Sequence, residues 1–200
     1  MAAVARRLIS RGFPLSPRLC RLASGVIPGV PRALDDVVRL DHLRRLPPDQ
    51  ILQIWASHHA DKRELAASAL EEREFSLLRA RGGESGSFIW PLKRGGGHML
   101  LFSQFSSAHS MFAFTALEDY RRSPELAPPW LSVLLFDELL DDKGLALVRA
   151  EADADRLTKD EVENLLSLVR RFYGTDDYDK VWAFNHFQKR FDIDAYISSV

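Results

Sequence analysis

The apolar residues of this chain follow a helical period near both ends and a strand-like pattern in the centre. The segment Pro48–His59 begins with a proline and an aspartate, which favour a first helical turn, and its apolar positions recur every three to four residues. This spacing predicts a helix with His58 on its packed side and His59 toward solvent. A second helix is predicted over about Glu64–Arg79, because that segment is rich in Ala and Glu and is followed by glycines.

Dense runs of Phe, Leu, Val, Ile and Trp follow and predict four strands, at Ser87–Leu92, His98–Phe105, Ser110–Leu117 and Trp130–Phe136. The glycine-rich turn 94–97 and the turn 106–109 are predicted to join the first three strands as hairpins. In the second and fourth runs, apolar residues occupy both the odd and the even positions, whose side chains point to opposite faces of a strand. That pattern indicates strands that are covered on both faces.

The last third of the chain predicts a strand at Leu145–Glu151 and then a helix. Thr158 and Glu161 form a capping box at the start of this helix, and Gly174 stands where a helix stop is expected. One or two final strands are predicted in 182–187 and 191–197. Strands grouped together, with helices before and after them, predict a single α+β domain in which helices pack on a largely antiparallel sheet.

The first 34 residues contain six arginines and no acidic residue, with serines interleaved among apolar side chains. This composition is typical of an organellar transit peptide, which an anionic membrane surface and a negative-inside potential attract. We therefore expect residues 1–34 to be a disordered presequence and linker, and residues 35–200 to be the domain that works in the mitochondrial matrix. A plain basic tail and a plastid address are the alternatives.

Without the leader, 21 basic and 28 acidic residues remain, which gives a formal charge of −7. An acidic domain that lacks a basic stripe is poorly suited to nucleic acid. No stretch reaches the roughly 18 apolar residues of a membrane span. The single cysteine, Cys20, lies in the leader, so residues 35–200 have no thiol for a disulfide, a zinc site or a nucleophile.

Several local patterns suggest chemistry, but each has a simpler interpretation. Adjacent residues on a helix point about 100° apart, so His58 and His59 are a poor pair of metal ligands. The glycine turn 94–97 precedes a strand rather than the helix of a phosphate-binding loop. The serines 103–110 with His109 lack the turn that exposes a catalytic serine. The sequence thus predicts no catalytic, cofactor or metal site and no small-molecule substrate.

Aromatic residues are concentrated in the strand-rich centre. Core packing accounts for most of them, yet a two-layer sheet can leave part of one face or one edge uncovered. Such a surface is suited to binding the unburied interface of another protein. The residues predicted to contact a partner are Phe102, Phe105, Phe112, Phe114 and Trp130.

The order of three central segments resembles a known family. They are SFIWPLKR at 87–94, HMLLFSQF at 98–105 and MFAFTALEDY at 111–120. This order is similar to that of the mitochondrial ATP synthase F(1) complex assembly factor family, and more narrowly to the chaperone dedicated to the beta subunit. The likeness extends over about residues 35–200. A compact Gly-Gly-Gly-His turn stands where the family more often has an aromatic-acidic pair.

The resemblance implies a non-enzymatic matrix chaperone without a cofactor. Such a chaperone binds the free beta subunit of the catalytic head and prevents its aggregation until the alpha subunit replaces it. Two other interpretations stay open at this stage. One is a matrix enzyme or small-ligand-binding domain with an unrecognised pocket, and the other is a structural subunit of a permanent complex.

Overall fold

The computed structural model describes residues 27–200, so most of the predicted presequence lies outside the described part of the chain. Six antiparallel strands form one sheet in the order β1-β6-β5-β4-β3-β2. The strands are β1 (Leu65–Glu71), β2 (Ser87–Arg94), β3 (Gly97–Ser106), β4 (Met111–Ala116), β5 (Leu131–Phe136) and β6 (Leu145–Ala152). The predicted α+β class, with helices packed on an antiparallel sheet, is confirmed.

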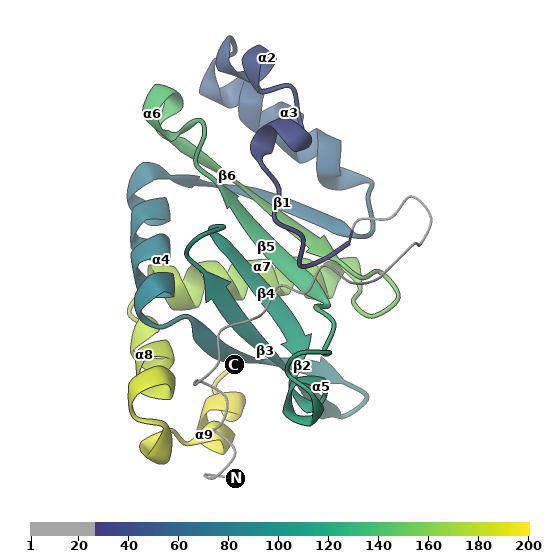
Figure 1. Cartoon of the computed structure of the whole chain (residues 1–200), viewed down its shortest axis with the longest axis vertical. Coiled ribbons are helices and arrows are strands. Elements are labelled where there is room, and N and C mark those ends of the chain that lie inside the picture. The colour runs from purple at the N-terminus through teal and green to yellow at the C-terminus, as the bar shows by residue number, and fades with distance from the viewer. Residues whose placement is uncertain (1–26) are drawn as a thin grey trace.

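Helices pack on both faces of this sheet (Figure 1). On one face, here the α7 face, lie α4 (Glu72–Glu84), α7 (Lys159–Gly174), α8 (Tyr178–His186) and α9 (Ile193–Ser198). On the other, here the α3 face, lie η1 (Leu34–Asp36), α2 (Leu40–Arg44), α3 (Pro48–Ala60) and α5 (Leu117–Arg122). The short α6 (Leu140–Lys143) leads into β6, and η2 (Gln188–Arg190) joins α8 to α9.

The two predicted hairpin turns are confirmed, because β2 pairs with β3 and β3 with β4 as antiparallel neighbours, the second pairing ending at Ser106 and Met111. Arg94 pairs with Gly97, so the loop between β2 and β3 has two residues. Its glycines, Gly95 and Gly96, have φ angles of 54° and 80°. Two successive positive φ angles suit the right-handed twist of a hairpin and are strained for any residue with a Cβ. The glycines in this position therefore set the register of the sheet's edge.

The larger core lies on the α7 face and is strongly aromatic. Phe88 and Trp90 of β2 have their ring centroids 5.3 Å and 5.8 Å from that of Phe172 on α7. The predicted capping box starts α7 as expected, because Thr158 Oγ1 accepts from the amide of Glu161 and the Glu161 carboxylate accepts from the amide of Thr158. A capped helix with a continuous apolar stripe anchors this layer.

The smaller core lies between α3 and the other face of the sheet, and Trp55 joins the two layers. Its ring is buried with Ile51 against residues such as Phe136 and Leu147. Its indole Nε1–H points at two backbone oxygens, 3.1 Å from that of Val148 on β6 and 3.2 Å from that of Ser68 on β1. One side chain therefore fixes the helix over the seam between two strands.

The predicted orientation of the two histidines on α3 is wrong. His59 is buried, 1% exposed, and His58 is exposed. The packed side of α3 runs through Ile51, Trp55 and His59 at steps of four residues, which turns Ile54 outward. His59 Nδ1 lies 2.6 Å from the carbonyl oxygen of Trp55, one turn back on the same helix. A hydrogen bond to that carbonyl lets an otherwise polar ring sit in the core.

The predicted helix over Glu64–Arg79 is also wrong in its first half, because 65–71 form β1 and α4 begins at Glu72. Every residue of β1 pairs with β6. The Glu71 amide donates to the Glu74 carboxylate at the point where the strand turns into the helix. Alanine and glutamate favour a helix in isolation, but pairing with a long buried neighbour decides the strand here.

The final strands predicted in 182–187 and 191–197 are helices instead, α8 and α9. In α8 the buried residues Tyr178, Val181 and Phe184 are three apart and lie on one side. Asp192 caps α9 by accepting a hydrogen bond from the amide of Ala195. Short aromatic segments can form either a strand or a helix. Here, packing of both segments along the outer edge of β2, which is an edge strand of the sheet, favoured helices.

Replacing Trp55 with Phe should remove both indole hydrogen bonds while keeping most of the ring. Two buried carbonyl contacts are lost, so we expect the free energy of unfolding to fall by about 1–3 kcal/mol. Leu52→Ala, at an exposed position of the same helix, is the control and should change it by about 0.5 kcal/mol or less. Chemical denaturation measures both variants. Equal losses for the two would contradict this role of the indole.

His59 should make stability depend on pH. The pKa of His59 is lowered from 6.5 to about 4. Burial is the largest cause, and the nearby charges of Arg149 and Lys62 act in the same direction. The hydrogen bond to the Trp55 carbonyl raises the pKa but does not outweigh them. The unfolded chain therefore binds a proton between about pH 6.5 and pH 4 that the folded chain does not. The free energy of unfolding should fall over that interval as pH decreases, by roughly 2–3 kcal/mol from this residue.

Denaturation of His59→Gln across the same pH range checks this prediction. The variant should show a flatter dependence than the wild type. His58→Gln, on the exposed side of the helix, should keep most of the slope. If His59→Gln and the wild type gave parallel curves, His59 would not be the group responsible.

Candidate protein-interaction surface

The five aromatic residues predicted to contact a partner are divided between the two faces of the sheet. Phe105, Phe112 and Phe114 point to the α7 face, where Phe112 and Phe114 are fully buried. Phe105 is partly buried and contacts Phe112, with ring centroids 4.6 Å apart. Its ring also lies against Gly82 of α4, where a Cβ would come within 2.8 Å of it. A glycine in this helix therefore makes room for the ring.

Phe102 and Trp130 point to the α3 face. Phe102 is 1% exposed and lies under Tyr120 of α5, with centroids 4.6 Å apart. Trp130 is partly buried, and the guanidinium of Arg156 lies 5.0 Å above its ring. The five residues thus form no continuous exposed surface. Phe102, Phe112 and Phe114 belong to the core because central strands are covered on both faces, and in this conformation a partner cannot touch them.

The edge strand β2 has side chains bonded to its outward backbone groups. The Asn185 side chain accepts from the amide of Ser87 and donates to its carbonyl oxygen. The Tyr196 hydroxyl donates to the carbonyl oxygen of Ile89 at 2.8 Å. Pro91 has no amide hydrogen to offer. A free edge would recruit a strand from another chain, so α8 and α9 block that mode of binding along the first half of β2.

Exposed aromatic surface gathers instead at the end of α8. Trp182 is 38% exposed and Phe187 is 47% exposed. The Trp182 ring centroid lies 4.9 Å from that of His186 and 5.2 Å from that of Phe187. We call these three residues the α8 patch. The strand predicted for 182–187 gave no sign of this patch. A helix with Val181 and Phe184 on its buried side turns Trp182 outward, and the three-residue spacing of these two apolar side chains is the signal that could have predicted it.

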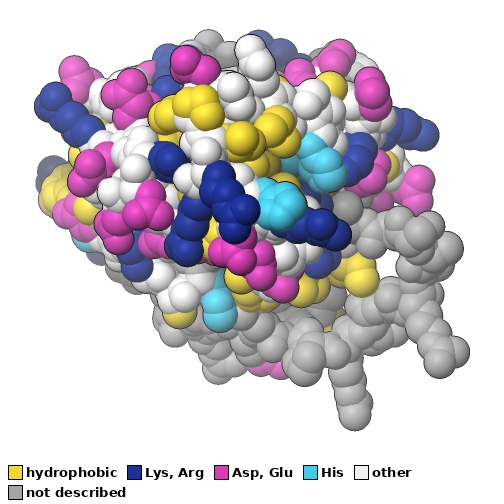
Figure 2. Space-filling view, turned by 90° about the horizontal axis from the view of Figure 1, so that it is seen from above, with side chains coloured by type: hydrophobic (Ala, Val, Ile, Leu, Met, Phe, Trp, Pro, Cys, Tyr) yellow, Lys and Arg dark blue, Asp and Glu magenta, His cyan; other side chains and the backbone are white. Residues whose placement is uncertain are grey.

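The opposite end of the molecule is more mixed. Leu52 and Ile54 of α3 are exposed there. Figure 2 views this end from above and shows apolar side chains beside Lys, Arg and His, with acidic residues distributed among them. No single sign of charge dominates this view. This end is therefore a less specific candidate than the α8 patch.

An open groove of about 480 Å³ lies beside α4, next to the turn between β3 and β4. Arg79 and Asp137 lie at this groove, with their charged groups 3.7 Å apart, and both side chains are about half exposed. Small-ligand sites usually bury their few polar groups. The groove therefore gives little support to the ligand-binding interpretation.

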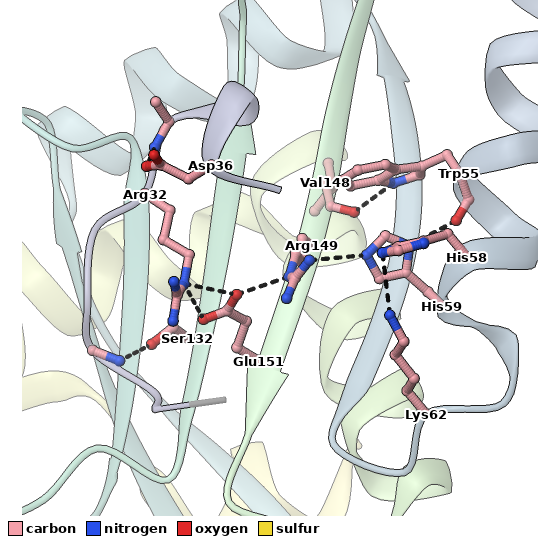
Figure 3. Close-up of polar contacts among 12 residues, drawn as sticks. Arg32, Asp36, Trp55, His58, His59, Lys62, Ser132, Val148, Arg149 and Glu151 are labelled. Carbon is pink, nitrogen blue, oxygen red and sulfur yellow. Dashed lines mark hydrogen bonds and ion pairs between the residues drawn. The ribbon is translucent and has the colours of Figure 1, made fainter. Parts of the chain in front are cut away.

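A buried ionic cluster crosses the α3 face where the chain enters the domain (Figure 3). Residues 27–33, here called the strap, run over β5 and β6. The Gly29 amide donates to the Ser132 hydroxyl. The Arg32 guanidinium lies 3.2 Å and 3.3 Å from the two carboxylate oxygens of Glu151. The strap belongs to the predicted leader and linker, yet it makes defined contacts with the sheet.

Glu151 is fully buried between two arginines. Arg149 Nε lies 2.8 Å from Glu151 Oε1, a distance that makes an ion pair, although the pair lacks the geometry of a hydrogen bond. Arg149 also reaches His59, with 3.4 Å between Nη1 and Nε2. Burial is the largest cause that lowers the pKa of Arg149, and the Glu151 charge raises it. The carboxylate therefore compensates a desolvated arginine inside the fold.

Within residues 27–200, no group of three or more His, Cys, Asp or Glu residues is placed to hold a metal ion. No helix in this part of the chain has both the length and the apolar character needed to cross a membrane. Of the serines considered above, Ser103 is fully buried and accepts a hydrogen bond from the Trp90 indole at 2.7 Å. Its hydroxyl has a structural partner in the core.

Known proteins resemble this chain over most of its length. It is 27% identical over 157 residues to the human protein named ATP synthase mitochondrial F1 complex assembly factor 1, an alignment that covers 77% of this chain and 47% of that protein. The zebrafish protein of the same name is 23% identical over 172 residues, with 84% and 56% covered. The chain thus spans about half the length of the curated relatives it matches.

A more distant relative comes from fission yeast. The Schizosaccharomyces pombe protein named Protein atp11, mitochondrial, is 21% identical over 148 residues, which cover 72% of this chain and 51% of that protein. The sequence model of the family described as ATP11 protein matches residues 28–197. That match includes residues 28–33 of the strap and every strand of the sheet. The chain therefore belongs to the ATP11 protein family.

Proposed function

We propose that this chain is a non-enzymatic assembly chaperone of the mitochondrial ATP synthase catalytic head. It acts in the matrix, binds the free beta subunit and keeps that subunit from aggregating until the alpha subunit replaces it. The family match over residues 28–197 carries this proposal, together with relatives whose names describe F1 complex assembly.

We place the main client contact at the α8 patch. Trp182 and Phe187 are the two exposed aromatic residues of α8 and the segment after it. Aromatic side chains supply large contact areas at little entropic cost and are enriched among the residues that dominate protein interfaces. Phe105 and Trp130, each partly buried, stay proposed as secondary contacts.

A patch of only three exposed side chains suits a temporary complex. A specific interface buries about 1,200–2,000 Å² in total, so other surface must contribute as well. The client's own partner interface is the natural target, because an unassembled subunit exposes apolar surface that aggregates. A chaperone that covers this interface must leave when the true partner arrives. Competition for one surface then drives the exchange without nucleotide hydrolysis.

Exchange between subunits tests the proposed function. The immobilised chain should retain purified free beta subunit and release it when excess alpha subunit is added. It should also reduce light scattering from heated beta subunit at a stoichiometric ratio. Bovine serum albumin at equal concentration controls for unspecific protection. Retained beta subunit that alpha fails to displace would contradict the exchange, and absence of retention would contradict the function.

The α8 patch should be required for that binding. The double variant Trp182→Ser/Phe187→Ser removes two aromatic contacts, and we expect the dissociation constant for free beta subunit to rise at least tenfold, since central aromatic contacts contribute about 2 kcal/mol each. The matched control, Leu52→Ser/Ile54→Ser, removes equally exposed apolar residues from α3 and should bind within about threefold of the wild type. If the α3 variant bound more weakly than the α8 variant, the main client contact would lie on α3 instead.

A further inference from the structure

The strap has two polar attachments to the sheet and little buried apolar surface, the close packing of Gly29 beside the Pro129 ring being its main apolar contact. Its apolar side chains Ile27 and Val30 are exposed. Two interactions hold the strap: the hydrogen bond from the Gly29 amide to the Ser132 hydroxyl, and the ion pair between the Arg32 guanidinium and the Glu151 carboxylate. Segments with few buried apolar contacts open at low free energy. The strap is therefore a part of the described chain that can separate from the sheet while both cores stay intact.

The hinge for such an opening lies at Leu34. Its side chain is fully buried in the core under α3, and its amide donates to Glu138 Oε1 at 2.7 Å. At Leu34 the chain is fixed to the domain by a fully buried side chain, whereas none of the seven residues before it is buried. The boundary between a movable and a fixed segment thus falls at one residue.

Two polar side chains lie beneath the strap and are fully buried when it is in place. Ser132 and Glu151 are direct cross-strand partners on β5 and β6, so they stand side by side on the α3 face. The strap offers them an amide hydrogen and a guanidinium three residues further along. Together they form a site that recognises a short segment of chain carrying an arginine.

This site can exchange its occupant without leaving an isolated charge. When Arg32 departs, Arg149 remains 2.8 Å from Glu151 and still compensates the carboxylate. Among the described residues, no donor makes a hydrogen bond to Glu151 Oε1, although that atom is buried. A buried carboxylate oxygen without a hydrogen bond favours any new donor that reaches it. Once Arg32 has left, the carboxylate can therefore accept an incoming guanidinium in its place.

We propose that the strap is an intramolecular occupant of a second client-docking site, and that an arginine-bearing segment of the client displaces Arg32 from Glu151. This inference rests on the proposed function, because the client is the free beta subunit. The strap then acts as a competitor that lowers the apparent affinity and makes client release easier. Displacement would extend the interface from the α8 patch to the α3 face of the sheet.

Two substitutions should change binding in opposite directions. Arg32→Gln weakens the strap and leaves the acceptor intact, so the full chain should bind free beta subunit roughly three- to tenfold more tightly than the wild type. Glu151→Gln removes the acceptor charge and should bind more weakly than the wild type. Arg32→Lys keeps the charge and is the matched control, with an affinity close to that of the wild type.

Amide hydrogen exchange gives a second measurement that does not depend on the variants folding well. On addition of free beta subunit, the Gly29 amide should lose protection because the strap leaves the sheet. The Leu34 amide, at the hinge, should stay protected. Protection of Gly29 that is unchanged or increased in the complex would overturn the inference.

The outcomes separate the two proposals. If the wild type fails to bind free beta subunit, the proposed function itself is wrong. If the wild type binds and Arg32→Gln leaves the affinity unchanged or weakens it, the function stands and the strap is not a competitor. Glu151→Gln also removes the carboxylate that compensates Arg149, so its binding is measured under conditions in which circular dichroism shows the variant to be folded. Weaker binding under those conditions locates the acceptor at Glu151.

Discussion

Burial of both faces of one six-stranded sheet is the constraint on which the rest of this structure depends. Every residue of β5 and β6 is buried, because α7 packs on one side and α3 with the strap on the other. Such a sheet cannot offer its central aromatic residues to a partner. The surfaces left for binding are helix ends, edges and any segment that can be moved aside.

The same constraint explains where polar groups had to be accommodated. A strand covered on both faces carries charge only if that charge is compensated, and Arg149 and Glu151 on β6 compensate each other. Trp55 and His59 bond to backbone carbonyls of their surroundings. The strap closes the remaining polar position. The same row of side chains on the α3 face thus contributes to the stability of the fold and to the proposed client exchange.

Several elements could be predicted from sequence because their signals are local. The glycine pair at 95–96 specifies a two-residue hairpin, and Thr158 with Glu161 specifies the start of α7. The apolar residues of both parities in β5 indicated a strand covered on both sides. By contrast, segments 65–71 and 182–187 have apolar patterns that suit two structures. Pairing of the first with β6, and packing of the second against β2, decided between them.

The sequence by itself determined the α+β class, the turns and the family, since these follow from periodicity, turn residues and the order of segments. Only the tertiary structure decided which aromatic residues are surface: it buried Phe112 and Phe114, exposed Trp182 and Phe187, and turned His59 inward. It also brought Arg32 to Glu151, 119 positions apart in the chain. Exposure and long-range ion pairs depend on what packs over each residue, and a local pattern does not contain that information.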